Sequence, residues 1–170
     1  MQSVNGVLGA TDDYTRVTGA VRKYVTLRRN LVFAGRLLLQ TSSGDVPMYD
    51  LPTMASSYKN EDALGGAKSL RGILKNRYIG KSMELENAEL RWRFKEFSVM
   101  GKPMYLLASG FVDAGRVWTD GIKPSELLTD LHVGYGGGMR VGVGPSFLVA
   151  IDLGKSSEST QLYIGLGYLF

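Results

Sequence analysis

The residues with the clearest chemistry in this sequence are one arginine and two acids, Arg71, Glu89 and Asp113. A guanidinium offers a planar fork of donors that stays charged, so two carboxylates can hold it in one fixed geometry. Arg71 lies in a polar stretch without alternation, whereas each acid lies in a segment where apolar and polar residues alternate. An arginine that met both acids would form an ionic clamp and hold a loop against two strands.

Two interpretations of this clamp stay open. It is either only a structural salt bridge, since buried ion triads often specify a conformation without adding stability, or a latch that braces its surroundings. Neither interpretation needs a reactive group. No order of Ser, His and Asp suggests a catalytic triad, and no glycine-rich loop precedes a helix to cradle phosphate. We therefore predict no catalytic residue and no enzyme activity.

The elements that must position these residues are β-strands. From 82 to 97 the apolar Leu90 alternates with the charged Glu89 and Arg91, and a period of two is typical of a strand with two unlike faces. The alternation places Asp113 on the same inward face as Glu89. Further segments that alternate are 14–27, 31–40, 104–118, 132–143, 147–153 and 161–170, and 4–10 is the tail of one more strand.

The connections between these strands alternate in length. Tight turns are predicted at 28–30, 101–103 and 144–145, and longer loops at 42–82, 119–130 and 155–159. Short turns at one rim and long loops at the other are typical of outer-membrane barrels, whose apolar side chains face lipid. A soluble barrel would instead place its apolar faces inside. We predict an all-β fold, an antiparallel transmembrane β-barrel with about eight strands in this chain.

The longest predicted loop, 42–82, contains Arg71 and is expected to be functional. Loops of this length are uncommon in a compact domain and are usually functional or disordered. The inward face of 132–143 is nearly all glycine and includes Gly134 and Gly136. A face without side chains leaves room for something bulky, so we expect loop 42–82 to fold into the lumen against it.

Composition excludes several classes of protein and of site. The chain has 170 residues, 44% of them hydrophobic, and no window approaches the roughly 20 apolar residues that a spanning helix needs. It contains no cysteine, and its one histidine, His132, cannot form a histidine metal cluster by itself. The formal net charge is +4, but the arginines are scattered singly over different strands. We predict no metal, no cofactor and no nucleic-acid partner, and we interpret Arg140 and Asp152 only as polar residues of the lumen.

Three segments of the sequence resemble one known family. They are 65–72 (GGAKSLRG), 111–118 (FVDAGRVW) and the ending 165–170 (GLGYLF). Together they resemble the C-terminal half of the Omp85 outer-membrane barrels, also called the bacterial surface antigen family, which includes the BamA and TamA assembly factors. The resemblance spans roughly residues 10–170. It implies that 1–170 is a C-terminal Omp85-type transmembrane barrel region without a POTRA domain.

The resemblance also implies roles for individual residues. In that family an Arg-Gly-aromatic loop tip folds back into the lumen, and its Arg meets acids on the next two strands. The loop latch implied for this chain consists of Arg71, Gly72, Glu89 and Asp113. The chain departs from the pattern at Ile73, where the family usually has Phe or Tyr. The chain ending resembles the β-signal that barrel assembly machinery recognises, and the residues of that signal are Tyr163, Gly165, Tyr168 and Phe170.

A location and a function follow from the same resemblance. The protein is expected in the cell outer membrane of a Gram-negative bacterium, where it would assist the insertion and assembly of outer-membrane proteins. Its partners would be outer-membrane lipid, other outer-membrane proteins, and a second barrel-forming or POTRA-bearing chain. Two alternatives stay open: a translocator or anchor for a passenger domain, and a passive structural barrel plugged by its own loop.

The number of strands leaves the architecture open. The family closes its barrel with about twice as many strands as are predicted here. The chain is therefore a fragment, a closed eight-stranded barrel, or half of a barrel that another chain completes. Side chains just fill the interior of a closed eight-stranded barrel, which leaves little space for a folded-in loop.

Overall fold

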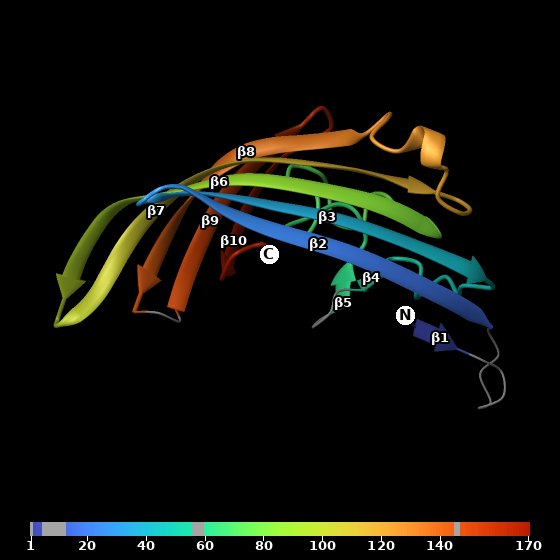
Figure 1. Ribbon diagram of the computed structural model, residues 1–170, viewed down its shortest axis with the longest axis horizontal. Coiled ribbons are helices and arrows are strands. Elements are labelled where there is room, and N and C mark those ends of the chain that lie inside the picture. The colour runs from blue at the N-terminus through green and yellow to red at the C-terminus, as the bar shows by residue number, and fades with distance from the viewer. Residues whose placement is uncertain (1, 5–12, 56–59, 145–146) are drawn as a thin grey trace.

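The computed structural model describes residues 2–4, 13–55, 60–144 and 147–170, and one antiparallel sheet of eight strands dominates it (Figure 1). These strands are β1 (Gln2–Val4), β2 (Tyr14–Arg28), β3 (Leu31–Gly44), β6 (Ser82–Val99), β7 (Lys102–Trp118), β8 (His132–Val143), β9 (Phe147–Ser156) and β10 (Thr160–Leu166), in that spatial order. A separate hairpin pairs β4 (Thr53–Ala55) with β5 (Asn60–Asp62), and Pro124–Glu126 forms the 3₁₀ helix η2. None of the described helical residues forms a segment long and apolar enough to cross a membrane. The predicted all-β, antiparallel class is confirmed.

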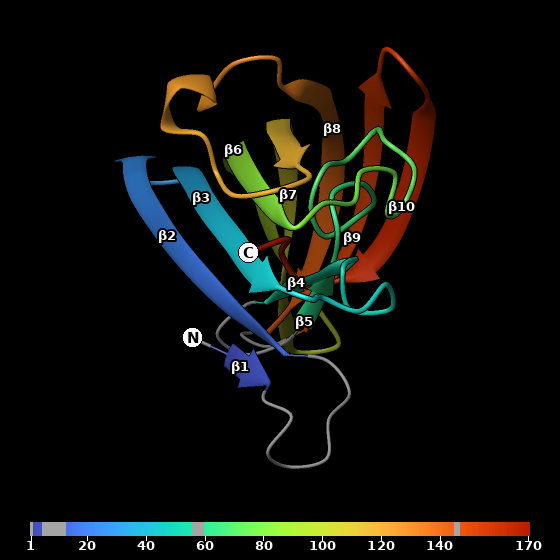
Figure 2. The same ribbon diagram turned by 90° about the vertical axis from the view of Figure 1, so that its right-hand side faces the viewer.

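The sheet is strongly curved but does not close (Figures 1 and 2). Within the described residues β1 and β10 are its two edges, and each pairs with a neighbour on one side only. An edge strand leaves a row of backbone N–H and C=O groups without partners in the sheet. The strands of this chain therefore form an open wall, not the closed eight-stranded barrel that was one of the alternatives.

Turn lengths agree with the predicted asymmetry between the two ends of the strands. β2 ends at Arg28 and β3 begins at Leu31, while β6 ends at Val99 and β7 begins at Lys102, so both connections are tight. The turn predicted at 144–145 lies partly outside the described residues, as does most of the predicted strand 4–10. The longer connections lie at the opposite end of the wall (Figure 1).

The two faces of the wall differ in polarity. On β6, Leu90 and Trp92 are exposed, whereas Glu89 and Arg91 point to the concave side and are buried. Other exposed apolar side chains on the convex face are Val21, Val25, Phe33, Leu37, Val112, Val133, Met139, Ile151, Leu153 and Ile164. An apolar outer face and a polar inner face are the arrangement of a transmembrane barrel wall.

The segment predicted as loop 42–82 is more structured than the alternation indicated. β3 continues to Gly44, and the segment contains the β4–β5 hairpin before it reaches β6 at Ser82. The sequence could not show this hairpin, because strands of three residues are too short for a period of two to be recognised. Beyond the hairpin, the loop folds under the concave face of the wall (Figures 1 and 2).

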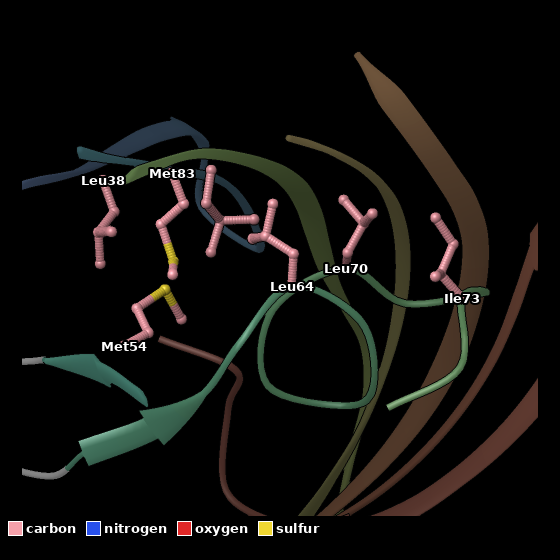
Figure 3. Close-up of a cluster of buried hydrophobic side chains, with 7 residues drawn as sticks. Leu38, Met54, Leu64, Leu70, Ile73 and Met83 are labelled. Atoms are coloured by element: carbon pink, nitrogen blue, oxygen red, sulfur yellow. The ribbon is translucent and has the colours of Figure 1, made fainter. Parts of the chain in front are cut away.

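Apolar packing joins this loop to the wall (Figure 3). Leu64 and Met54 of the loop face Leu38 of β3 and Met83 of β6. The complete cluster is Leu38, Met54, Leu64, Leu70, Ile73, Met83 and Leu85, and no member is more than 2% exposed. Burying one such side chain stabilises a fold by about 1.5–3 kcal/mol, so the cluster is a substantial anchor for the loop.

The chain ending departs from the predicted strand 161–170. β10 ends at Leu166, and Gly167 adopts a φ of 86°, a left-handed conformation that glycine enters without steric cost. From there the chain turns to the concave side, where Leu169 is buried and the ring of Phe170 lies 5.1 Å from the guanidinium carbon of Arg36. The prediction that this strand continues to Phe170 is therefore wrong.

Candidate functional site

The guanidinium of Arg71 is enclosed by two acids from neighbouring strands. Its Nε donates to Asp113 Oδ2 at 2.7 Å and its Nη2 to Asp113 Oδ1 at 3.1 Å, which is a bidentate pair. Its Nη1 donates to Glu89 Oε2 at 2.9 Å. Asp113 belongs to β7 and Glu89 to β6, and neither side chain is exposed. The structure thus brings together the arginine and the two acids that the sequence singled out.

An aromatic ring completes the arginine's surroundings. The guanidinium carbon of Arg71 lies 3.4 Å from the centroid of the Phe111 ring, so the charged plane packs against the face of a π-system. Ile73, which takes the position of the family's usual aromatic residue, lies in the apolar cluster instead. The ring that stacks on the arginine therefore comes from the wall rather than from the loop tip.

Two further strands extend the ionic network. Asp152 of β9 lies 3.3 Å from Arg71 Nη1, and Arg140 of β8 contacts both Asp152 Oδ1 at 2.9 Å and Glu89 Oε1 at 3.2 Å. Arg91 of β6 donates to Glu89 Oε1 at 2.9 Å. With Asp113, the network contains three arginines and three carboxylates, so its charges balance inside the wall.

Arg140 and Asp152 were predicted as polar residues of the lumen but not as members of the clamp. The sequence did indicate that both residues lie on the inward faces of adjacent strands. Arg140 pairs across the sheet with Ala150, two residues before Asp152. Alternation shows on which face of a strand a residue lies, but not how two strands align along their length. The contact between Arg140 and Asp152 could therefore not be derived from the sequence.

A second polar contact holds the loop backbone just before Arg71. The side-chain nitrogen Nδ2 of Asn87 donates to the carbonyl oxygen of Ser69 at 2.8 Å and to Asp113 Oδ1 at 2.7 Å. Arg36 of β3 donates to Asn87 Oδ1 at 2.8 Å and to the carbonyl of Lys68 at 2.9 Å. The loop is therefore held through its main chain as well as through the arginine side chain.

Glycines on β8 and β9 make the close approach of the loop possible. A Cβ built on Gly134 would lie 1.8 Å from the carbonyl oxygen of Arg71, and one on Gly154 would lie 2.6 Å from the nitrogen of Gly72. Both distances are too short for any side chain. The glycine face predicted to accommodate the loop does so directly opposite the Arg71–Gly72 tip.

The four residues of the predicted C-terminal signal do not form one cluster. Tyr163 points into the loop, where its hydroxyl accepts a hydrogen bond from the Gly72 N–H at 2.9 Å. Tyr168 and Phe170 lie against Arg91, whose guanidinium carbon is 4.2 Å and 5.3 Å from their ring centroids. A Cβ on Gly165 would meet open space.

A separate polar cluster holds the loop to the rim. Arg77 Nε donates to Glu158 Oε2 at 2.9 Å, and the Tyr78 hydroxyl donates to Glu158 Oε1. The Tyr78 ring stacks on His132 with 3.6 Å between centroids. Hydrogen bonds from Tyr78 and then Arg77 hold the pKa of Glu158 below its usual value, and burial followed by the bond to Glu158 raises the pKa of Tyr78 to about 12.

The domain of one protein family matches the chain over its whole length. The Omp85 superfamily domain matches residues 1–170. The chain belongs to the Omp85 superfamily. Members of this superfamily are outer-membrane barrels and translocators involved in the insertion or translocation of proteins at the Gram-negative outer membrane. No curated protein and no solved structure matches the chain.

The geometry of this Omp85 chain limits what its site can do chemically. Each acid that Arg71 contacts lies on a strand, the guanidinium packs against the Phe111 ring, and the Arg71 backbone N–H donates to Asp113 Oδ2 at 3.1 Å. Such an arrangement holds two elements in one relative position. The site can therefore hold the loop against the wall.

Proposed function

We propose that this chain is the C-terminal part of an Omp85-type barrel that assists the insertion and assembly of outer-membrane proteins, and that its ionic network latches the loop to the barrel wall. The observation that carries the proposal is the buried bidentate pair between Arg71 and Asp113, with Glu89 as the second acid. A charge network of this kind is well suited to fix one arrangement of loop and wall.

The faces of the wall support a location in the outer membrane of a Gram-negative bacterium. The convex face exposes aliphatic and aromatic side chains along every long strand, while the concave face carries the buried arginines and acids of the ionic network. In hydrocarbon, only a wall whose backbone groups are paired within the sheet is stable. We therefore propose that further strands, from the same polypeptide or from another chain, complete the wall beyond β1 and β10.

The open edge at β10 supports the role in insertion. Leu162, Ile164 and Leu166 project outward from it and are 62%, 72% and 69% exposed. An edge strand can pair with a strand of a client protein, and burial of the client's apolar face in lipid then drives insertion without a nucleotide. In this proposal the latch keeps the rest of the wall in place while the edge changes partners.

Reconstitution tests this function. The full-length protein that carries this chain is placed in phosphatidylethanolamine and phosphatidylglycerol vesicles, and the folding rate of an added, urea-unfolded outer-membrane barrel is followed by its resistance to protease. We expect faster folding than in vesicles that hold an unrelated outer-membrane barrel at the same protein-to-lipid ratio. Equal folding rates in the two kinds of vesicle would contradict the insertion role. Transport of an attached passenger across the vesicle membrane would favour the translocator.

A further inference from the structure

The last β-hairpin binds both the backbone N–H and the carbonyl group of Gly72. Its N–H donates to the hydroxyl of Tyr163 at 2.9 Å. Its carbonyl oxygen accepts hydrogen bonds from the hydroxyls of Ser156 at 2.8 Å and Ser159 at 2.7 Å. The Tyr163 hydroxyl also donates to the carbonyl of Ile73 at 3.3 Å. Three hydroxyls from β9, β10 and the turn between them thus bind the backbone of one residue of the loop tip.

The backbone of Gly72 packs directly against the last hairpin. Gly72 has a φ of 92°, and a Cβ on it would lie 2.6 Å from the carbonyl carbon of Lys155. The facing Gly154 is equally closed by the nitrogen of Gly72. The loop tip therefore lies in direct contact with the backbone of the last hairpin. A shift of the hairpin toward the loop would displace the tip.

Adjacent residues of the tip consequently hold two distant parts of the wall. The Arg71 side chain is fixed to Asp113 on β7, and the Gly72 peptide is fixed to Tyr163 on β10. β7 and β10 are not neighbours, because β8 and β9 lie between them in the sheet. The tip thus provides a link across the concave side that bypasses the hydrogen-bond ladder of the sheet.

We infer that Tyr163, with Ser156 and Ser159, positions the edge strand β10 by coupling it to the Arg71–Asp113 latch. β10 has a single neighbour in the described sheet, so it depends on contacts outside the ladder more than any inner strand does. Release of the latch on β7 therefore loosens β10, and release of the tyrosine loosens the loop tip. The coupling is a property of this chain, whereas its use in controlling the edge during insertion rests on the function proposed above.

Amide hydrogen exchange of the full-length protein in lipid nanodiscs tests the coupling. Three variants are compared with the unmodified protein: Tyr163→Phe, Asp113→Asn and, as a matched control, Tyr135→Phe, which removes a hydroxyl from the exposed face of β8. We expect the first two to raise the exchange rates of residues 160–166 and 69–73 by roughly fivefold, the effect of about one lost hydrogen bond on local opening. The control leaves both segments unchanged.

The decisive observation is the effect of Asp113→Asn on β10. A substitution that only weakened its own surroundings would raise exchange in β6 and β7 and leave 160–166 unchanged, and this result would overturn the inference. Tyr163→Phe is replaced by Ser159→Ala if it raises exchange equally in all strands. Ser159→Ala removes one of the two hydroxyls that donate to the Gly72 carbonyl. Unchanged exchange of residues 160–166 and 69–73 in that variant would also overturn the inference. Client folding is measured separately, so coupling without insertion would contradict only the proposed function.

Discussion

At the scale of single residues, the choice of arginine at position 71 is explained by the geometry of its partners. The fork of the guanidinium contacts Asp113 in a bidentate manner, reaches Glu89 with the remaining nitrogen and presents a flat face to Phe111. A lysine carries the same charge but is a point donor without a plane. Charge alone therefore does not satisfy this site.

Arg71→Lys is accordingly expected to behave as a damaging substitution. It keeps the positive charge but loses at least one charge-assisted hydrogen bond and the stacking contact, which weakens the latch by about 1.5–3 kcal/mol. The measurement is the rate at which protease cuts loop 42–82 in the folded protein. Lys75→Arg, within the same loop, serves as the control. Unchanged protection in Arg71→Lys would show that only the charge matters.

Glu158 gives the rim a predictable dependence on pH. Hydrogen bonds from Tyr78 and Arg77 lower the pKa of Glu158 below the usual 4.5 in the folded protein. A carboxylate with a depressed pKa stabilises the fold above its unfolded pKa, and that stabilisation is lost as the pH falls through the folded pKa. We expect the contact between Tyr78 and Glu158 to persist at neutral pH and to weaken only below about pH 4.5.

Carbon-13 NMR of the Glu158 carboxyl group measures this pKa. Tyr78→Phe removes the donor with the largest effect, so it should move the pKa of Glu158 up toward its usual value. Tyr49→Phe removes a hydroxyl from an exposed tyrosine of the same loop and should leave that pKa unchanged. A pKa that is identical in the two variants would contradict the assigned hydrogen bond.

At the scale of elements, the glycine face of β8 determines whether the loop can lie inside the wall. Gly134→Ala should displace the loop tip, because the added Cβ would meet the Arg71 carbonyl oxygen at 1.8 Å. Overpacking of this kind costs about 1–3 kcal/mol. Protease sensitivity of loop 42–82 should rise.

Gly110→Ala on β7 is the matched control for that substitution. A Cβ on Gly110 meets nothing within 4 Å, so the protein should tolerate it. If both variants keep the loop equally protected, the close contact between β8 and the loop tip is not the one that holds the loop. If both release it, the effect comes from replacing a strand glycine rather than from the contact.

Strands were predictable from the sequence because each has two unlike faces. The alternation of Leu90 with Glu89 and Arg91 identifies β6 and assigns its acids to the inside, and the burial of these residues agrees. The β4–β5 hairpin and the inward turn after Leu166 were not predictable. The first is too short to show a period, and the second depends on a positive φ at Gly167 and on arginines of other strands.

The candidate site was predictable only in part, for a related reason. Face assignments and the family resemblance located Arg71, Glu89 and Asp113, but contacts that depend on the alignment of non-adjacent strands stayed hidden. Three such contacts reach the loop tip, from Asp152, Asn87 and the hydroxyl of Tyr163. The alternation of apolar and polar residues does not reveal how their strands align along their length. These contacts are also the ones that connect the clamp to the rest of the wall.

At the scale of the whole molecule, the chain is an open wall with a loop fixed to its concave side. The polar inner face explains a mean hydropathy of −0.04 in a chain whose convex face is apolar along its long strands. The ionic network joins the loop to β6, β7, β8 and β9, and Tyr163 adds β10. Among the described residues, loop 42–82 contacts every strand from β6 to the edge, and its contact on β8 is Gly134.

The most direct test of this account is a double-mutant cycle on the insertion rate of a client barrel. Arg71→Ala, Asp113→Ala and the double variant are reconstituted in vesicles after each has been shown to fold. Either single change leaves a buried charge without its partner, a cost of about 3–5 kcal/mol, and should slow insertion. Because the two residues act as one latch, the double variant should be no slower than the single ones. Losses that add, or insertion rates equal to that of the unmodified protein, would contradict the account.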